Sequence, residues 1–271
     1  MIRRLQTGFT LIEIAIVLLI VSIILGYTVA MVPIQQELKQ YRSAEKEIDG
    51  IIESLYAFAR VNGYLPCPAV LAGPANSNGF ECRDNPGFPA ICDAPANWNS
   101  QTHDCGSFVG LVPGKTLGLE GDYDENGLLV DPWGNPYRYQ VTESDFTGGL
   151  GVVGGDFVLQ GDMQAVTMQN LSPDLYVCNT DPSFGGLPEG DTTCGGAANE
   201  IAQLVPAVVL SEGKPGINSS TQAENLDNGP ADTVFVKTPF SDSGNDAFND
   251  IIKWIAPNVL YSRMIDGGQL P

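Results

Sequence analysis

The sequence predicts an α+β protein in which one long amino-terminal helix packs against an antiparallel β-sheet. Three observations predict this fold. The chain of 271 residues has a nearly uncharged apolar run from Phe9 to Val32, then an amphipathic pattern to about Asn62, and then short strand-like runs between turn residues. Because we find neither an internal repeat nor a long linker, we expect one exported globular headgroup, residues 65–271, after the helix.

The apolar run from Phe9 to Val32 carries a single charged residue, Glu13. A membrane-spanning helix needs about 20 apolar residues, so residues 9–32 are long enough to cross a bilayer. Arg3 and Arg4 precede the run, which predicts a cytoplasmic amino terminus and an exported remainder. A cleaved secretory signal has a shorter apolar region followed by a small-residue cleavage site, and the residues after Val32 provide no such site.

The amphipathic pattern that follows predicts that the helix continues through residues 33–64. Apolar residues recur every three or four positions, with charged residues between them. Pro33 is expected to kink the helix because it removes one backbone hydrogen bond, and Gly63 and Pro66 predict its end. The apolar positions are Leu38, Tyr41, Ile48, Ile51, Ile52, Leu55, Phe58 and Ala59.

Residues Gly8 to Glu13 read GFTLIE and stand between a short basic leader and the long apolar run. This arrangement resembles the processing site of type IV pilins and type II secretion pseudopilins. The resemblance implies that a prepilin peptidase removes leader residues 1–8 by cutting after Gly8 and methylates the new amino terminus at Phe9. It also implies a single-pass inner-membrane protein, which the inner-membrane assembly machinery packs with other subunits into a periplasmic or extracellular helical filament.

Glu13 is the costly residue of the apolar run. A carboxylate at bilayer depth costs about 2.5–3.5 kcal/mol, so we expect it to have a cationic partner. Cleavage creates a cationic partner, the amine of Phe9. Because residues four apart on one helix are neighbours, this amine could neutralise Glu13 within the same chain. The resemblance implies instead that Glu13 meets the Phe9 amine of an adjacent subunit. The alternative is that Glu13 is a tolerated polar residue in a helix that serves only as a membrane anchor.

Residues Asp131 to Tyr137 read DPWGNPY, a turn with an aromatic anchor before a strand. The segment closely resembles one in the major pseudopilin of type II secretion, and Val209–Gly216 is similar to the sheet-edge strand and loop of that family. The cysteine-rich part departs from that small protein. Together with the chain length, this departure favours a minor pilin or a specialised pseudopilin. The alternatives are a major pilin with a large headgroup and a membrane-anchored exported binding domain or enzyme that never polymerises.

The cysteines predict disulfide bonds and an oxidising compartment, because their number is even and their surroundings are rich in Gly, Pro and Asn. Cys178 and Cys194 form a natural local pair, which leaves three ways of joining the other four. All six lie beyond the apolar run: Cys67, Cys82, Cys92, Cys105, Cys178 and Cys194.

The headgroup is expected to begin with a disulfide-tied loop region at 67–110. Short helical pieces are predicted at Phe248–Ile255 and Asn258–Ile265. The predicted strands are Tyr137–Thr142, Gly151–Leu159, Ala165–Met168, Leu175–Cys178, Ala207–Leu210 and Thr233–Val236.

Charge and motif content argue against nucleic-acid binding and catalysis. The net charge is −19, and no Lys or Arg occurs between Arg138 and Lys214, so the basic footprint of a nucleic-acid partner is missing. His103, the single histidine, stands in a polar loop and is expected at the surface. Because no hydrolase, zinc-protease or phosphate-binding motif occurs, we expect no enzyme activity and no organic cofactor.

A calcium site is the one metal-binding hypothesis. Asp122, Asp124 and Asn126 fit the first half of an EF-hand loop, but Trp133 stands where the closing glutamate belongs and Asp131 is the nearest substitute. A solvated acidic turn explains the same residues. The family resemblance adds a second place, a late loop within Ser211–Asp232, with the candidates Asn225, Asp227, Asn228 and Asp232.

Overall fold

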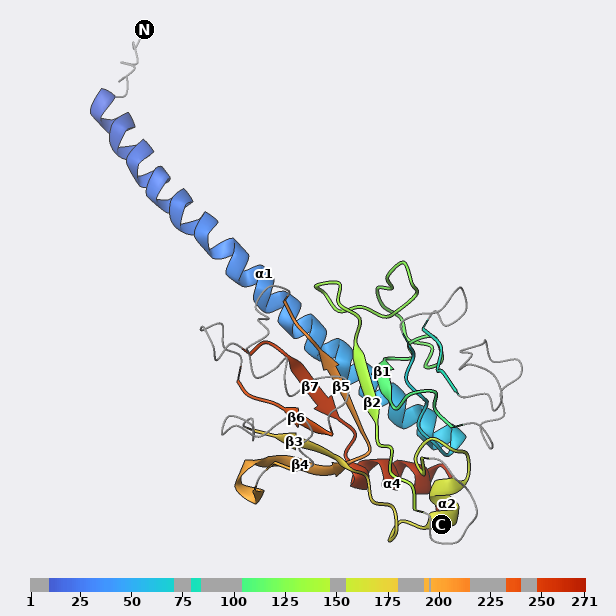
Figure 1. Cartoon of the computed structure of the whole chain (residues 1–271). Coiled ribbons are helices and arrows are strands. Elements are labelled where there is room, and N and C mark those ends of the chain that lie inside the picture. Colours follow the sequence, from blue (N-terminus) through green and yellow to red (C-terminus); the bar gives the residue numbers. More distant parts are fainter. Residues whose placement is uncertain are drawn as a thin grey trace. The chain divides into compact units, whose positions relative to one another are not determined.

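The computed structural model describes residues 10–70, 79–83, 104–146, 155–179, 193–194, 196–214, 233–239 and 248–271, shown in colour in Figure 1. Residues 26–34 are described by their helical backbone alone. The chain divides into two compact units, residues 1–43 and 44–271. The second unit holds the sheets and is the headgroup.

Helix α1 (Leu11–Asn62) confirms the predicted long amino-terminal helix. Its backbone runs through Pro33 without a break. It ends where Gly63 adopts a left-handed φ of 83° and donates its N–H to the Ala59 carbonyl at 2.8 Å. A glycine favours this position because it has no Cβ to clash in the left-handed conformation.

Within the headgroup, α1 supplies a buried stripe at the predicted spacing. Its buried positions are Ala44, Ile48, Ile51, Ile52, Leu55, Tyr56 and Ala59. Burying each large aliphatic side chain stabilises the fold by about 1.5–3 kcal/mol. This stripe explains why the carboxyl-terminal half of the helix folds with the sheets.

The first sheet has four strands in the order β1 (Val109–Leu111), β2 (Arg138–Val141), β5 (Ala207–Ser211) and β7 (Ile251–Trp254). Every pairing in it is antiparallel. Strand β5 is buried along its whole length because it has a partner on each side. The part of helix α1 that belongs to the headgroup unit, residues 44–62, lies behind this sheet in Figure 1.

The second sheet has three strands in the order β4 (Glu200–Val205), β3 (Leu175–Cys178) and β6 (Val234–Val236). Strand β3 pairs antiparallel with β4 and parallel with β6. One apolar core cluster contains residues of both sheets, among them Val177, Leu210 and Phe235. The predicted α+β class is therefore confirmed, although the β3–β6 pair departs from a purely antiparallel arrangement.

Three short helical elements complete the described part: α2 (Asp162–Val166), the 3-10 turn η3 (Ala197–Asn199) and α4 (Pro257–Asp266). Helix α4 confirms the helix predicted at Asn258–Ile265. It begins with Pro257, whose fixed φ suits a first helical position, and it buries Leu260 and Met264 one turn apart.

The helix predicted at Phe248–Ile255 is wrong, because this segment contains strand β7. Its two isoleucines pair with the end of β5, with Ser211 opposite Ile251 and Leu210 opposite Ile252. A short apolar run is compatible with the periodicity of a helix and with that of a strand. This segment is a strand because the open edge of β5 is available for pairing.

Two predicted strands are also wrong where the structure describes them. Ala165–Met168 contains the end of α2, and Gly155–Leu159 forms turns; Gly151–Gly154 lie outside the described residues. Two strands escaped prediction. Strand β1 lies within the expected loop region 67–110, and β4 carries polar and exposed residues typical of a sheet edge.

Candidate functional site

The start of helix α1 contains a capping box formed by Thr10 and Glu13. The Glu13 carboxylate accepts hydrogen bonds from the Thr10 N–H and hydroxyl, both at 3.3 Å, and the Glu13 N–H donates to the Thr10 hydroxyl at 3.4 Å. This reciprocal bonding satisfies N–H groups that have no partner inside the helix. The T-x-x-E spacing of a capping box is visible in the sequence, although the expectations for Glu13 were a cationic partner or a tolerated polar residue.

The following residues form an apolar surface that the chain itself leaves exposed. From Leu11 to Leu25, the large apolar side chains are between 43% (Val21) and 89% (Leu11) exposed. They lie on all sides of the helix, so no single face can be turned inward. An apolar surface of this extent requires cover from lipid or from other chains. Gly8 and Phe9 lie outside the described residues.

Within the part of the chain that the structure describes, no helix has both the length and the apolar content of a membrane span.

In the headgroup, the DPWGNPY segment is fastened by the buried carboxylate of Asp131. One oxygen accepts the N–H groups of Trp133 and Asn135, both at 2.9 Å, and the other accepts the Ser211 hydroxyl at 2.6 Å. The Asn135 side chain also donates to the Gly213 carbonyl at 2.6 Å. Asp131 therefore joins this turn to the end of β5.

Tyr137 extends the same segment to helix α1. Its hydroxyl donates to the Glu47 carboxylate at 2.8 Å. Burial is the main cause that raises the pKa of Tyr137, and the hydrogen bond to Glu47 adds to it. The phenol therefore stays neutral and remains a donor. The segment thus connects the helix, the turn and the sheet.

The structure gives the EF-hand-like residues local partners. Asp124 accepts the N–H groups of Asn126 and Leu128 at 2.9 and 2.7 Å, and its second oxygen accepts the Asn126 amide at 3.1 Å. Among the described residues, no group of three or more His, Cys, Asp or Glu side chains is arranged to hold a metal ion. Calcium binding stays a prediction, and the late-loop candidates at 225–232 lie outside the described residues.

Comparisons with known proteins agree with these observations. The prokaryotic N-terminal methylation motif matches residues 3–29. The chain is also 29% identical over 137 residues to the type II secretion system core protein G of Pseudomonas aeruginosa, an alignment that covers 51% of this chain and 75% of that protein. Both similarities point to the type IV pilin and type II secretion pseudopilin family. No solved structure matches the chain.

The motif and the secretion-system relative support the interpretation of the chain as a structural, pilin-like subunit. The family is structural rather than catalytic, in keeping with the expectation that the chain is not an enzyme. The recognition made from the GFTLIE segment is therefore confirmed.

The headgroup of this pilin-like chain contains the predicted disulfide bonds. Cys178 is joined to Cys194, the local pair that the sequence favours, and Cys67 is joined to Cys105 across 38 positions. Cys82 is disulfide-bonded as well. Cys92 and His103 lie outside the described residues. The Cys67–Cys105 bond ties the chain that leaves α1 to the residues just before β1.

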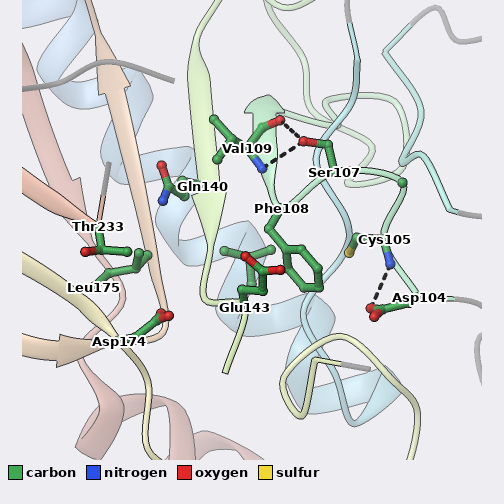
Figure 2. A pocket seen from close by; sticks show the side chains of 12 residues that line it. Asp104, Cys105, Ser107, Phe108, Val109, Gln140, Glu143, Asp174, Leu175 and Thr233 are labelled. Atoms are coloured by element: carbon green, nitrogen blue, oxygen red, sulfur yellow. Dashed lines mark hydrogen bonds between the residues drawn. The ribbon is translucent and has the colours of Figure 1, made fainter. Parts of the chain in front are cut away.

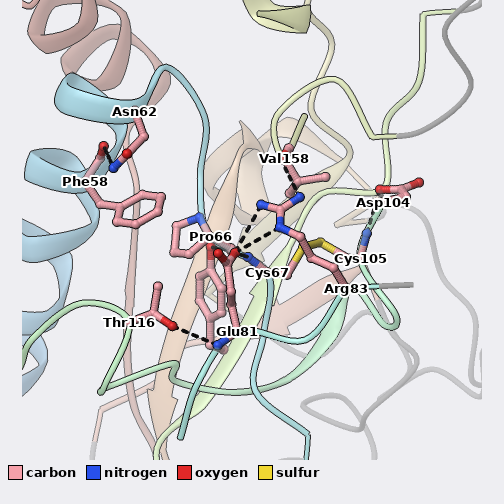
Figure 3. A network of polar contacts seen from close by, with 11 residues as sticks. Phe58, Asn62, Pro66, Cys67, Glu81, Arg83, Asp104, Cys105, Thr116 and Val158 are labelled. Atoms are coloured by element: carbon pink, nitrogen blue, oxygen red, sulfur yellow. Dashed lines mark hydrogen bonds and ion pairs between the residues drawn. A yellow bond between two sulfur atoms is a disulfide. The ribbon is translucent and has the colours of Figure 1, made fainter. Parts of the chain in front are cut away.

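A buried ion pair beside that disulfide was not anticipated from the sequence (Figure 3). Arg83 is fully buried, and its Nε and Nη2 donate to one oxygen of Glu81 at 3.2 and 3.1 Å. The same oxygen accepts the Cys67 N–H at 3.1 Å, and Arg83 Nη1 donates to the Val158 carbonyl at 3.0 Å. The guanidinium also lies 5.0 Å from the centre of the Tyr64 ring. One arginine thus connects three segments that are distant in sequence.

A cavity of about 550 Å³ opens between the β1–β2 side of the headgroup and the start of β3 (Figure 2). Its walls carry the carboxylates of Asp104, Glu143 and Asp174, and among the described residues that line it none is a histidine, lysine or arginine.

Proposed function

We propose that the chain is a minor or specialised subunit of its filament, with type II secretion as the favoured setting. The observation that carries the assembly role is the all-round exposure of the apolar side chains from Leu11 to Leu25. Support for type II secretion comes from the relative that is named a core protein of that system. That alignment covers about half of this chain, and the size and disulfides of the headgroup support a specialised rather than an abundant subunit.

The proposed processing follows from the motif at residues 3–29. A prepilin peptidase cuts after Gly8 and methylates Phe9, and the mature subunit then begins one residue before Thr10. Cleavage leaves the Thr10–Glu13 capping box intact, because both residues belong to the mature chain. In the filament, Glu13 exchanges its local donors for the amine of Phe9 on a neighbouring subunit.

Before assembly, the subunit is anchored in the inner membrane as a single-pass protein with a cytoplasmic amino terminus. Arg3 and Arg4 support this orientation. The partners are other pilin-like subunits, the peptidase and the inner-membrane assembly machinery. The acidic chain makes nucleic acid an unfavourable partner.

Purified filaments test this proposal. Mass spectrometry of the chain in the filament fraction is expected to show an amino terminus at methylated Phe9, and immunolabelling is expected to mark few sites, concentrated at the tip. Labelling along the whole shaft would identify a major pilin. A chain with an intact leader that is found only in membranes would support a non-polymerising anchored domain and would overturn the proposal.

Calcium binding at Asp122 and Asp124 is proposed as a separate property of the headgroup. A chelator is expected to lower the melting temperature of the full-length chain in detergent micelles, because a ligand that binds the folded state stabilises it. The double variant Asp122→Ala/Asp124→Ala is expected to lose this chelator effect. Asp266→Ala, an exposed residue of α4, serves as the matched control and should keep it. An unchanged wild-type melting temperature would leave these residues as a plain turn.

A further inference from the structure

Asp156 joins the Gly155–Val158 segment to residues 144 and 146 of the headgroup. Its N–H donates to the Ser144 carbonyl, and one oxygen of its carboxylate accepts the Phe146 N–H, both at 2.9 Å. The residue is only 2% exposed. An ionised carboxylate is therefore held away from water, which is unfavourable unless nearby donors or cations compensate it.

Gly155, Phe157 and Val158 fasten their segment to three other parts of the headgroup. The Gly155 N–H lies 3.3 Å from both carboxylate oxygens of Asp104. The Phe157 carbonyl accepts the N–H of Leu65, just past the helix, at 2.7 Å. The Val158 carbonyl accepts Arg83, as described above. Every residue of the segment thus makes a contact with a distant part of the headgroup.

The charges that face this segment are mostly negative. Asp145 comes from the adjoining loop and Asp162 from α2, and both act on Asp156 through space. Asp104 acts in turn on Asp162. The positive charge that contacts the segment, Arg83, is already paired with Glu81. On the nearby cavity wall, Glu143 and Asp174 add further negative charge.

Burial raises the pKa of Asp156 to about 6, the Phe146 N–H opposes this rise, and the charges of Asp145 and Asp162 add to it. Burial likewise raises the pKa of Asp162. Within the described residues no carboxylate trio is arranged to share a metal ion, so the proton is the counterion that this geometry accommodates.

We propose that Asp104, Asp145, Asp156 and Asp162 form a pH-sensitive clasp. The clasp holds the Gly155–Val158 segment against Leu65, just past helix α1, more firmly at mildly acidic pH than at neutral pH. An acid that is harder to ionise in the folded state binds a proton there before it does in the unfolded chain. The stabilisation is therefore complete below the ordinary aspartate range, and it is lost progressively as the pH rises from there through about pH 6.

Thermal unfolding of the full-length chain in detergent micelles, at about pH 7.5 and about pH 5, tests the clasp. The wild-type melting temperature is expected to rise on acidification by about 3–5 °C more than that of Asp156→Asn. At the higher pH, Asp156→Asn should melt above the wild type, because the amide keeps an oxygen for the Phe146 N–H and has no charge. Asp266→Asn, exposed on α4, should keep the wild-type pH response.

Two further measurements localise the effect. The hydrogen-exchange protection factor of the Leu65 amide is expected to rise on acidification in the wild type and to stay level in Asp156→Asn. The side-chain carboxyl carbon of Asp156 should titrate near pH 6 in NMR spectra of the wild type. The clasp would be overturned if the Asp156 carboxyl titrated in the ordinary aspartate range. It would also be overturned if the melting temperature of Asp156→Asn responded to pH as that of the wild type does. If Asp156→Asn fails to fold, Asp145→Asn must reduce the pH response for the proposal to stand.

Discussion

Replacing Glu13 with glutamine is expected to abolish incorporation of the chain into filaments while the protein remains in the membrane fraction. Glutamine can still accept the hydrogen bonds from Thr10, so the capping box survives. It cannot neutralise the amine of Phe9, which would then be buried among apolar helices without a counterion. A free-energy cost of about 1.4 kcal/mol lowers an equilibrium constant tenfold. We expect burial of the unpaired amine to cost at least this much, so incorporation should fall by at least about tenfold. Quantitative immunoblotting of membrane and filament fractions measures it.

Thr10→Ala is the matched control for this variant. It removes the hydroxyl of the capping box but keeps the carboxylate of Glu13. Loss of a cap costs about 0.5–2 kcal/mol of helix stability, so assembly should be reduced much less than in Glu13→Gln. If Glu13→Gln assembles normally while Thr10→Ala does not, the carboxylate acts only as a helix cap and the pairing with Phe9 is wrong.

Replacing Arg83 with methionine is expected to destabilise the headgroup by about 3–5 kcal/mol, because it leaves the Glu81 carboxylate without its cation at a site where its side chain is 16% exposed. The Val158 carbonyl also loses its donor. Urea unfolding of the full-length chain in detergent micelles, with the disulfides intact, measures this loss in the free energy of unfolding.

Two variants show whether the effect of Arg83→Met comes from the unpaired charge. The double variant Glu81→Gln/Arg83→Met is expected to recover part of the lost stability, because no unpaired carboxylate remains. Arg138→Ala removes an arginine from a pair with Glu212 whose side chains are 19% and 44% exposed, and it should cost no more than about 1 kcal/mol. Equal losses in Arg83→Met and Arg138→Ala would contradict a central role for the buried pair.

The amino-terminal part of the molecule could be predicted from sequence because its signals are local. The run from Phe9 to Val32, the spacing of Ile48, Leu55 and Ala59, and the stop at Gly63 each depend on neighbours within one or two helical turns. The Cys178–Cys194 bond also closes a short loop. The strands β2, β3, β5 and β6 carried enough apolar and β-branched residues to be recognised without their partners.

The remaining features depend on residues that meet only after the chain has folded. Segment 251–254 became a strand because β5 offered it an open edge, and Cys67 found Cys105 across a large sequence separation. The sequence offered Asp131 only as a candidate metal ligand, and the fold brings the Trp133, Asn135 and Ser211 donors to its carboxylate.

The resemblance to pilins and pseudopilins and the long helix were thus accessible from the order of residues alone, because they are encoded by short motifs and by periodicity. The burial of Arg83 and Asp156 was not, because the cost of burying a charge depends on which groups from distant segments surround it. No local pattern records that environment, and long-range contacts created it when helix α1, the disulfide and the loops came together.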